Sequence, residues 1–385
     1  MNDAAEKKVS SKEQLQEVFR EAQAKKTPVS LYRKAKAGGI ALDFSEWKEI
    51  EVFDIDNLMV IVPPGTLLKE LNAVASAKGL RFIPADTPAY ENLSVGEWAY
   101  QGCPNPSVWK YDAGKHFLLG GSYVLPTGEI TPVGGKCIKN VTGYDFTRFL
   151  TGAYADLAVG VRYIIKLMPQ PAYRKRYDVT FKTLTEAIAL IDYLQSRPVP
   201  PAWLFWADET TGSKLFGQAQ KGQRVLFELD GNEAEVRDQA KEVDAHLAGV
   251  NSEIAAEAAT IPNLSGLEET TEGFWLLDEL KIPYTAVESF AAKLNKLLGE
   301  KGIQGGLFGQ LADGKIHLYL QQDPQQSKAV ITALQAEAYA LGGIGSGKYA
   351  RLYEGAANSP LAALENAFRQ HIDPQQIFNQ GEVGK

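Results

Sequence analysis

Residues 134–150, GGKCIKNVTGYDFTRFL, hold the polar residues whose types and spacing could most readily do chemistry. Asn140, Gly143, Tyr144 and Asp145 lie between apolar flanks, in a pattern typical of a strand end, a tight turn and a helix start. Polar side chains in such a place need hydrogen-bond partners. The partner is either the rest of the fold, with Asp145 capping the helix and Asn140 closing the turn, or a bound cofactor. Both can hold at once, because a capped turn can also border a cofactor.

A catalytic base near neutral pH is most often histidine, and the chain has only four. They are His116, His246, His317 and His371. No two of them form the close pair that would indicate a metal-assisted base. We therefore expect surface or packing roles, and only His317, in the predicted strand KIHLYL, is placed to face another domain. Arg162 and Arg351 are possible clamps for a carboxylate, and no catalytic residue is assigned.

The two cysteines, Cys103 and Cys137, lack neighbours at metal-ligand spacing. We expect both to be buried as small apolar side chains. The sequence therefore predicts neither a disulfide framework nor a metal site.

Composition narrows the class of protein. With 45% hydrophobic and 23% charged residues, the 385-residue chain has the balance of a globular protein large enough for two cores. A net charge of −7 argues against nucleic acid as a partner, since phosphate backbones require a basic surface. The charged start is unlike a signal peptide, and no run is apolar enough to span a bilayer. The expected location is the cytoplasm, with membrane association only through a partner.

Several elements must position these residues. SSKEQLQEVFREAQAKK predicts an amphipathic helix capped by Ser10 or Ser11. EVFDIDNLMVIVPPG predicts two strands around a polar turn, and TLLKELNAVASAKGL predicts a helix that stops at Gly79. HFLLGGSYVLPTGEITPV predicts a hairpin. The region between residues 85 and 113 is rich in turn residues.

After Pro171 the sequence alternates regular strands and helices, which favours an antiparallel sheet with helices on one face. In this part Asp313-Gly314 predicts a second hairpin. Trp203, Phe205 and Trp206 predict a sheet core, with partner docking as the alternative. GGIGSGKY lacks the spacing of a phosphate loop and is interpreted as a structural turn or linker. The predicted division is 1–171, 172–345 and a C-terminal segment, 346–385, that returns to the first domain.

Two segments carry a resemblance to a known family. VLPTGEITPVGGKCIKNVTGYDFTRFLTG resembles the central segment of flavoproteins of the vanillyl-alcohol-oxidase and p-cresol-methylhydroxylase (PCMH) superfamily. DPQQIFNQGEV resembles their closing segment. Within the superfamily the chain is most similar to the small flavin-type (E) subunit of bacterial glycolate oxidase.

The resemblance implies an α+β fold: a PCMH-type FAD-binding domain of two subdomains, followed by an α+β cap domain. It implies FAD as the cofactor and an accessory, electron-transferring role in an FAD-linked glycolate or lactate dehydrogenase complex. The implied partners are a larger catalytic flavin subunit and an iron–sulfur subunit. The residues it assigns to FAD binding are Arg33, Lys34, Pro64, Gly65, Ser94, Val95, Gly96, Asn140, Gly143, Tyr144 and Asp145.

Three motifs depart from the family pattern. The loop after PVS keeps only Gly38 and Gly39 of a glycine run, leaving Arg33 and Lys34 either to attract a diphosphate by charge or to lie in a solvated loop. Glu97 stands where the pattern has a second glycine, and AYADLAVG replaces a Gly-Thr-Leu-Gly segment. Two alternatives to the accessory subunit therefore remain: a scaffold without cofactor, and a stand-alone FAD oxidase.

Overall fold

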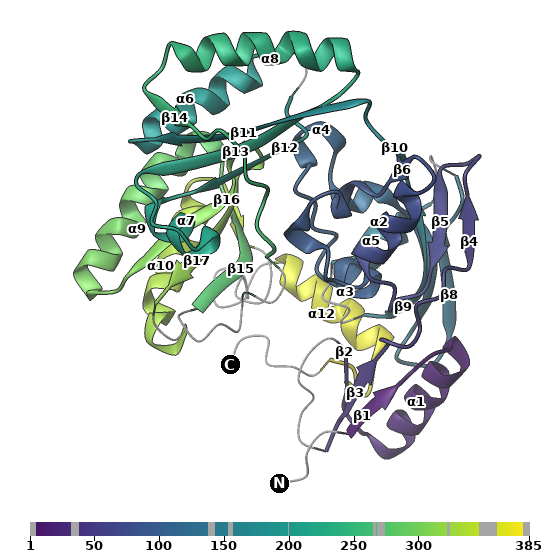
Figure 1. Cartoon of the computed structure of the whole chain (residues 1–385). Helices are drawn as coiled ribbons and strands as arrows, with labels where there is room; N and C mark the ends of the chain where they lie inside the picture. Colours follow the sequence, from purple (N-terminus) through teal and green to yellow (C-terminus); the bar gives the residue numbers. More distant parts are fainter. Residues whose placement is uncertain are drawn as a thin grey trace.

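The structure is a computed structural model that describes residues 5–31, 38–137, 143–152, 157–198, 200–264, 267, 274–321, 324–345 and 360–379. Over these residues the chain forms four β-sheets with helices packed against them (Figure 1). The predicted α+β fold is confirmed. In the same residues no helix is long and apolar enough to cross a membrane.

A small parallel sheet, in the order β1-β3-β2, opens the chain and carries helix α1. The side chain of Ser11 caps α1 by accepting a hydrogen bond from the N–H of Gln14. Leu15, Val18 and Phe19 are fully buried at helical spacing, so the predicted amphipathic helix is confirmed. The bounds are β1 Ala5–Lys8, α1 Lys12–Lys25, β2 Val29–Leu31 and β3 Ile40–Asp43.

The C-terminal segment that follows helix α12 (Pro360–Ile372) lies against this first sheet. Phe378 forms an isolated parallel bridge with Val29, and the side chain of Asn379 accepts from the N–H of Leu31 at 2.8 Å. The end of the described chain is thus tied to its beginning.

A five-stranded antiparallel sheet follows, in the order β4-β5-β9-β7-β8. The strands β7 and β8 pair as the predicted hairpin, and Asp54 accepts from the N–H of Asn57 in the predicted polar turn. The helix before Gly79 also forms, and Gly79 stands beyond its end with a φ of 70°. The bounds are β4 Val52–Asp54, β5 Met59–Val62, α2 Leu68–Ser76, α3 Val95–Tyr100, α4 Val108–Tyr111, the 3₁₀ helix η3 Gly114–Phe117, β7 Leu118–Val124, β8 Ile130–Gly134, α5 Phe146–Leu150 and β9 Val159–Lys166.

An eight-stranded sheet makes up the later part of the chain, in the order β14-β11-β13-β12-β16-β17-β15-β18, with antiparallel pairing throughout. A short pair, β6 (Leu80–Arg81) with β10 (Met168–Pro169), precedes it. The strands are β11 Tyr173–Phe181, β12 Trp203–Ala207, β13 Gln223–Gly231, β14 Ser252–Ile254, β15 Phe274–Lys281, β16 Gly305–Gln310, β17 Lys315–Leu320 and β18 Ile344–Gly345. The helices are α6 Leu184–Gln195, α7 Glu209–Phe216, α8 Glu233–Ala248, α9 Val287–Lys301 and α10 Pro324–Ala340.

The two faces of this sheet pack differently. One face meets the helices α6, α8, α9 and α10, and Trp206 belongs to the apolar core between them (Figure 1). The other face shares one continuous core with the earlier part of the chain, which joins Trp203 and Phe205 to Trp98 and Phe117. The predicted sheet-core role of all three aromatic residues is confirmed.

The turn predicted at Asp313-Gly314 joins β16 to β17 and is also confirmed. One expectation was wrong: Cys103 is buried, whereas Cys137 is exposed, because it lies beyond the end of β8 and outside the core. The segment GGIGSGKY is described only as far as residue 345. The domain boundaries near residues 171 and 345 stay predictions.

Candidate functional site

Two of the predicted FAD-binding segments, 30 positions apart in the sequence, lie side by side. Pro64 and Gly65 follow β5, and Ser94 to Gly96 begin α3. The N–H of Gly96 donates to the carbonyl of Pro64 at 2.9 Å, and the N–H of Val95 donates to that of Thr66 at 2.8 Å. We call residues 64–66 and 94–97 the shelf. The sequence analysis assigned both segments to FAD binding, and their contact with a cofactor stays a prediction.

Glu97 closes the shelf. Its carboxylate accepts a hydrogen bond from the N–H of Ser94 at 2.8 Å, and its own N–H donates to the Ser94 hydroxyl at 3.2 Å. This reciprocal pair is a capping box, which satisfies donors that a helix start would otherwise leave free. The N–H groups of residues 94–97 therefore all have acceptors inside the protein.

Gly65 is needed for a close approach between parts of the protein's own backbone. A Cβ at this position would lie 1.9 Å from the carbonyl oxygen of Phe44 and 2.7 Å from that of Trp47. Its N–H donates to the Trp47 carbonyl at 3.0 Å. This glycine serves packing of the loop after β3 and leaves no open space for a ligand on that side.

The third predicted segment, Gly143 to Asp145, is open in contrast. Gly143 has a φ of 76°, and a Cβ added there would meet no atom of the described residues within 4 Å. Tyr144 is 89% exposed. Asp145 accepts from the N–H of Arg148 at 3.0 Å, so its predicted role as the cap of α5 is confirmed. Arg33, Lys34 and Asn140 lie outside the described residues.

A row of aromatic side chains starts at this open segment. Tyr144 contacts Phe146, Phe146 contacts Phe149, and Phe149 contacts Phe368 of α12, with ring centroids 6.3, 6.1 and 5.1 Å apart. Each of the four rings is exposed, as is Leu364 one turn earlier in α12. We call Tyr144, Phe146, Phe149 and Phe368 the aromatic row. Contiguous exposed apolar surface is typical of interaction sites, whereas single exposed apolar residues are not.

An Asp–His pair lies where α4 ends and η3 begins. Nδ1 of His116, in η3, contacts the carboxylate of Asp112. Asp112 has φ 74° and ψ 171°, a conformation that is costly for a residue other than glycine. Burial raises the pKa of Asp112, but its hydrogen bonds from Ala113 and His116 and the charge of Arg148 outweigh this, so the pKa is lowered. The geometry holds the imidazole in one orientation and leaves Nε2 for another contact.

The other histidines and arginines of interest are dispersed. His317 is buried in β17 beside Phe308, on the sheet face that meets the earlier part of the chain. His246 stacks on Tyr193 between the outer helices, and His371 is exposed at the end of α12. Arg162 forms an ion pair with Glu51, and Arg351 lies beyond the described part. No group of three or more His, Cys, Asp or Glu in the described residues could hold a metal ion.

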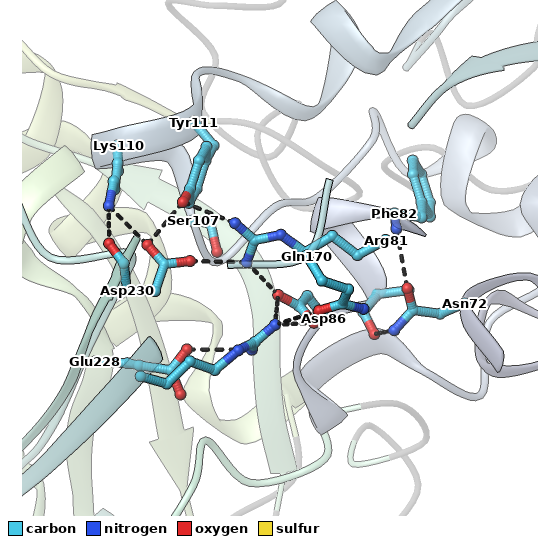
Figure 2. Close-up of polar contacts among 12 residues, drawn as sticks. Asn72, Arg81, Phe82, Asp86, Ser107, Lys110, Tyr111, Gln170, Glu228 and Asp230 are labelled. Atoms are coloured by element: carbon cyan, nitrogen blue, oxygen red, sulfur yellow. Dashed lines mark hydrogen bonds and ion pairs between the residues drawn. The ribbon is translucent and has the colours of Figure 1, made fainter. Parts of the chain in front are cut away.

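A buried ion network, which the sequence did not predict, joins the first part of the chain to the eight-stranded sheet (Figure 2). At its centre Asp230 of β13 accepts hydrogen bonds from Arg81, Lys110 and Tyr111, each at 2.7 Å. The side chain of Asp230 is 0% exposed. The members of this network are Arg81, Asp86, Lys110, Tyr111, Arg174, Glu228 and Asp230.

Two further carboxylates complete the network. Asp86 contacts Arg81 at 2.6 Å and Arg174 at 2.9 Å, and Glu228 contacts Arg174 at 3.3 Å. Glu228 also pairs with the half-exposed Arg176 at 2.7 Å. The only sequence signal for this arrangement is a pair of acids two positions apart in the otherwise apolar strand VLFELDG, which places both on one face.

The two buried acids respond to their surroundings in opposite ways. Burial alone would raise the pKa of Asp230, but the hydrogen bonds from Lys110 and Tyr111 and the charge of Arg81 lower it. Burial raises the pKa of Glu228, and the charges of Arg176 and Arg174 compensate only in part. Asp230 is therefore the better stabilised anion of the two.

The resemblance implies FAD as the cofactor. The shelf and the open segment differ in how well they could hold it. The shelf does not fit a cofactor held by its backbone N–H groups, because these have acceptors within the protein and the Glu97 carboxylate lies on it. The open segment at Gly143 and Tyr144 has free space and an exposed ring. In the described residues, open space is present at Gly143, whereas the shelf as it stands offers FAD no free backbone N–H group.

Comparison with protein families gives two matches that follow one another along the chain. Residues 4–134 match the family described as FAD binding domain. Residues 170–383, more than half of the 385 residues, match FAD linked oxidases, C-terminal domain.

Among curated proteins, the chain is 24% identical over 381 residues to the glycolate oxidase subunit GlcD of Bacillus subtilis, covering 90% of this chain and 79% of that protein. It is 25% identical over 358 residues to the glycolate oxidase subunit GlcE of Escherichia coli, covering 90% and 87%. Among solved structures, p-cresol methylhydroxylase with substrate bound superposes with a TM-score of 0.75 at 15% identity, over 98% of this chain and 88% of that one. This last likeness shows the fold alone.

Proposed function

The chain belongs to the FAD-linked oxidases, and from this premise we propose that it is the accessory, electron-transferring subunit of an FAD-linked 2-hydroxy-acid dehydrogenase complex of glycolate or lactate type. It is an oxidoreductase of this family, and its cofactor is FAD. The implied partners are a larger catalytic flavin subunit and an iron–sulfur subunit. The likeness to both GlcD and GlcE supports a place in such a complex, since both are named as subunits of glycolate oxidase.

The observation that carries the proposal is the aromatic row. It begins at Tyr144, in the segment proposed to border FAD, and runs across α5 onto α12. A subunit that passes electrons must present its cofactor close to a partner, and contiguous exposed apolar side chains favour such a contact. The proposed occupant of this surface is the larger flavin subunit.

FAD is proposed to lie against Pro64, Gly65, Ser94, Val95, Gly96, Asn140, Gly143, Tyr144 and Asp145, with Arg33 and Lys34 toward its diphosphate. The 1–171 segment would form the FAD domain and 172–345 the cap domain, with 346–385 returning to the first. When bound, FAD supplies the acceptor for a hydride or electrons. The chain's own residues would orient the cofactor and limit its contact with water.

The base and the carboxylate clamp for a 2-hydroxy acid are proposed to lie in the larger subunit. Oxidation of such a substrate needs a base for the hydroxyl proton and a cation for the carboxylate, both beside the flavin. The test is to purify this chain alone, record its flavin spectrum, supply FAD and assay glycolate and both lactate enantiomers with an artificial electron acceptor. Flavin without turnover supports the proposal, whereas absence of flavin would favour a scaffold.

One observation favours a second candidate, a stand-alone FAD oxidase. His116 is oriented by Asp112, and the charge of Arg148 in α5 acts on Asp112. This arrangement has the elements of a base and an anion clamp near the open segment. Turnover by the chain alone that is lost in His116→Asn or in His317→Ala would establish this alternative and reject the accessory role.

A further inference from the structure

We propose that the Glu97 side chain limits how tightly this chain holds FAD, by keeping the shelf closed to the cofactor. The inference rests on the proposed placement of FAD against Ser94 to Gly96. If Glu97 is the residue that keeps FAD from the shelf, removing its side chain should make FAD bind more tightly.

The hydrogen bonds of the shelf show why Glu97 is the residue that matters. The N–H groups of Val95 and Gly96 donate to backbone carbonyls of residues 66 and 64, and these bonds are fixed by the fold. The N–H of Ser94 donates instead to the carboxylate of Glu97. A side chain can be removed or can rotate away, so a substitution at Glu97 can release this donor, whereas the backbone acceptors of the Val95 and Gly96 N–H groups stay in place.

Charge acts in the same direction. Glu97 is half-buried, and its neighbours Ser94, Val95 and Trp98 are buried, so its carboxylate lies where solvent screens it only in part. FAD carries a negatively charged diphosphate and electron-rich ring carbonyls. A carboxylate on the shelf therefore repels the cofactor and also takes up the space that it would occupy.

The capping box itself offers a matched control elsewhere in the chain. Thr183 and Glu186 form the same reciprocal pair at the start of α6, with Glu186 accepting from the N–H of Thr183 at 2.9 Å. The substitution Glu186→Ala removes an equivalent helix cap from α6, which packs on the outer face of the eight-stranded sheet (Figure 1). Any change in FAD binding that follows only from a general loss of stability should therefore appear in Glu186→Ala as well.

The experiment titrates the full-length chain, freed of bound flavin, with FAD and follows quenching of the flavin fluorescence. Glu97→Ala is expected to lower the dissociation constant about tenfold, the effect of one additional hydrogen bond to a charged group. Glu97→Gln keeps the bulk and an acceptor for the Ser94 N–H while removing the charge, so it should give a smaller gain. Glu186→Ala should leave the dissociation constant unchanged.

The result that would overturn the proposal is unchanged or weaker FAD binding in Glu97→Ala, with a circular dichroism spectrum matching that of Glu186→Ala. If Glu97→Ala does not fold, the inference is decided by Glu97→Gln, for which unchanged FAD binding is the contrary result. Failure of the proposed placement would show differently, as unchanged flavin content in Gly143→Val. Failure of the accessory role would show as turnover of the wild-type chain alone.

Discussion

Replacing Asp230 by asparagine should sharply destabilise the protein, because this carboxylate holds the ion network together. Its side chain is 0% exposed and accepts from Arg81, Lys110 and Tyr111, each at 2.7 Å. Asparagine keeps the shape but leaves the buried Arg81 and the partly buried Lys110 without their shared anion. Breaking a buried ion pair from one side typically costs about 3–5 kcal/mol in free energy of unfolding. We expect a loss of this size for Asp230→Asn, measured by urea denaturation at neutral pH.

The matched control is an acid of the same type in an exposed ion pair. Asp238 contacts Lys241 at 2.8 Å, with both side chains 76% exposed. Asp238→Asn should leave the urea midpoint unchanged, because exposed pairs contribute little to stability. If Asp230→Asn and Asp238→Asn had the same urea midpoint, the ion network would not stabilise the fold as proposed.

The pH dependence gives a second readout of the same substitution. The pKa of Asp230 is lowered in the folded protein, so its contribution is fully present above its unfolded pKa of about 3.9 and is lost as the pH falls through the folded value. The difference in stability between wild type and Asp230→Asn should therefore be constant near neutral pH and shrink only below about pH 4. A difference that shrinks between about pH 7 and pH 5 would contradict the assigned direction of the pKa shift.

Three further predictions follow from the site and its surroundings. Glu228→Gln should lower the free energy of unfolding by less than Asp230→Asn in the same urea experiment. Burial raises the pKa of Glu228, so its charged form is less favoured than that of Asp230. A larger loss for Glu228→Gln would refute this ranking. Gly143→Val should lower the flavin content of the purified protein by blocking close approach, whereas Gly217→Val, at another open glycine with positive φ, should not; equal flavin content in both would reject the placement of FAD. Phe149→Ser should weaken co-purification with the larger flavin subunit. Ile254→Ser, which removes an exposed apolar side chain elsewhere, should have no effect. If both variants retained the larger subunit equally, the aromatic row would not be part of the interface.

Local patterns were predictable from the sequence where local chemistry decides the structure. Ser11 and Asp145 cap their helices as expected, and the hairpin at Asp313-Gly314 forms, because each depends on residues within a few positions. The family resemblance assigned both shelf segments to FAD binding, but their direct contact through backbone hydrogen bonds emerged only in the fold. The rotamer of Glu97, which completes the capping box with Ser94, was not predicted, because a side-chain hydrogen bond of this kind competes with other partners.

The ion network could not be predicted from the sequence, for a different reason. Arg81 and Asp230 are 149 positions apart, and their contact depends on how the eight-stranded sheet packs against the earlier part of the chain. A strand pattern shows which residues share a face, but it does not show what that face meets. The aromatic row has the same origin, since Phe149 and Phe368 come together only in the fold.

The most direct test of the proposed function is reduction of the flavin in the FAD-loaded chain by glycolate or D-lactate under anaerobic conditions. The proposal predicts that the flavin absorption band of this chain stays unchanged when substrate is added to the chain alone. It should bleach once the larger flavin subunit is added together with substrate. Bleaching by substrate in the isolated chain would contradict the accessory role and establish a catalytic site within this subunit.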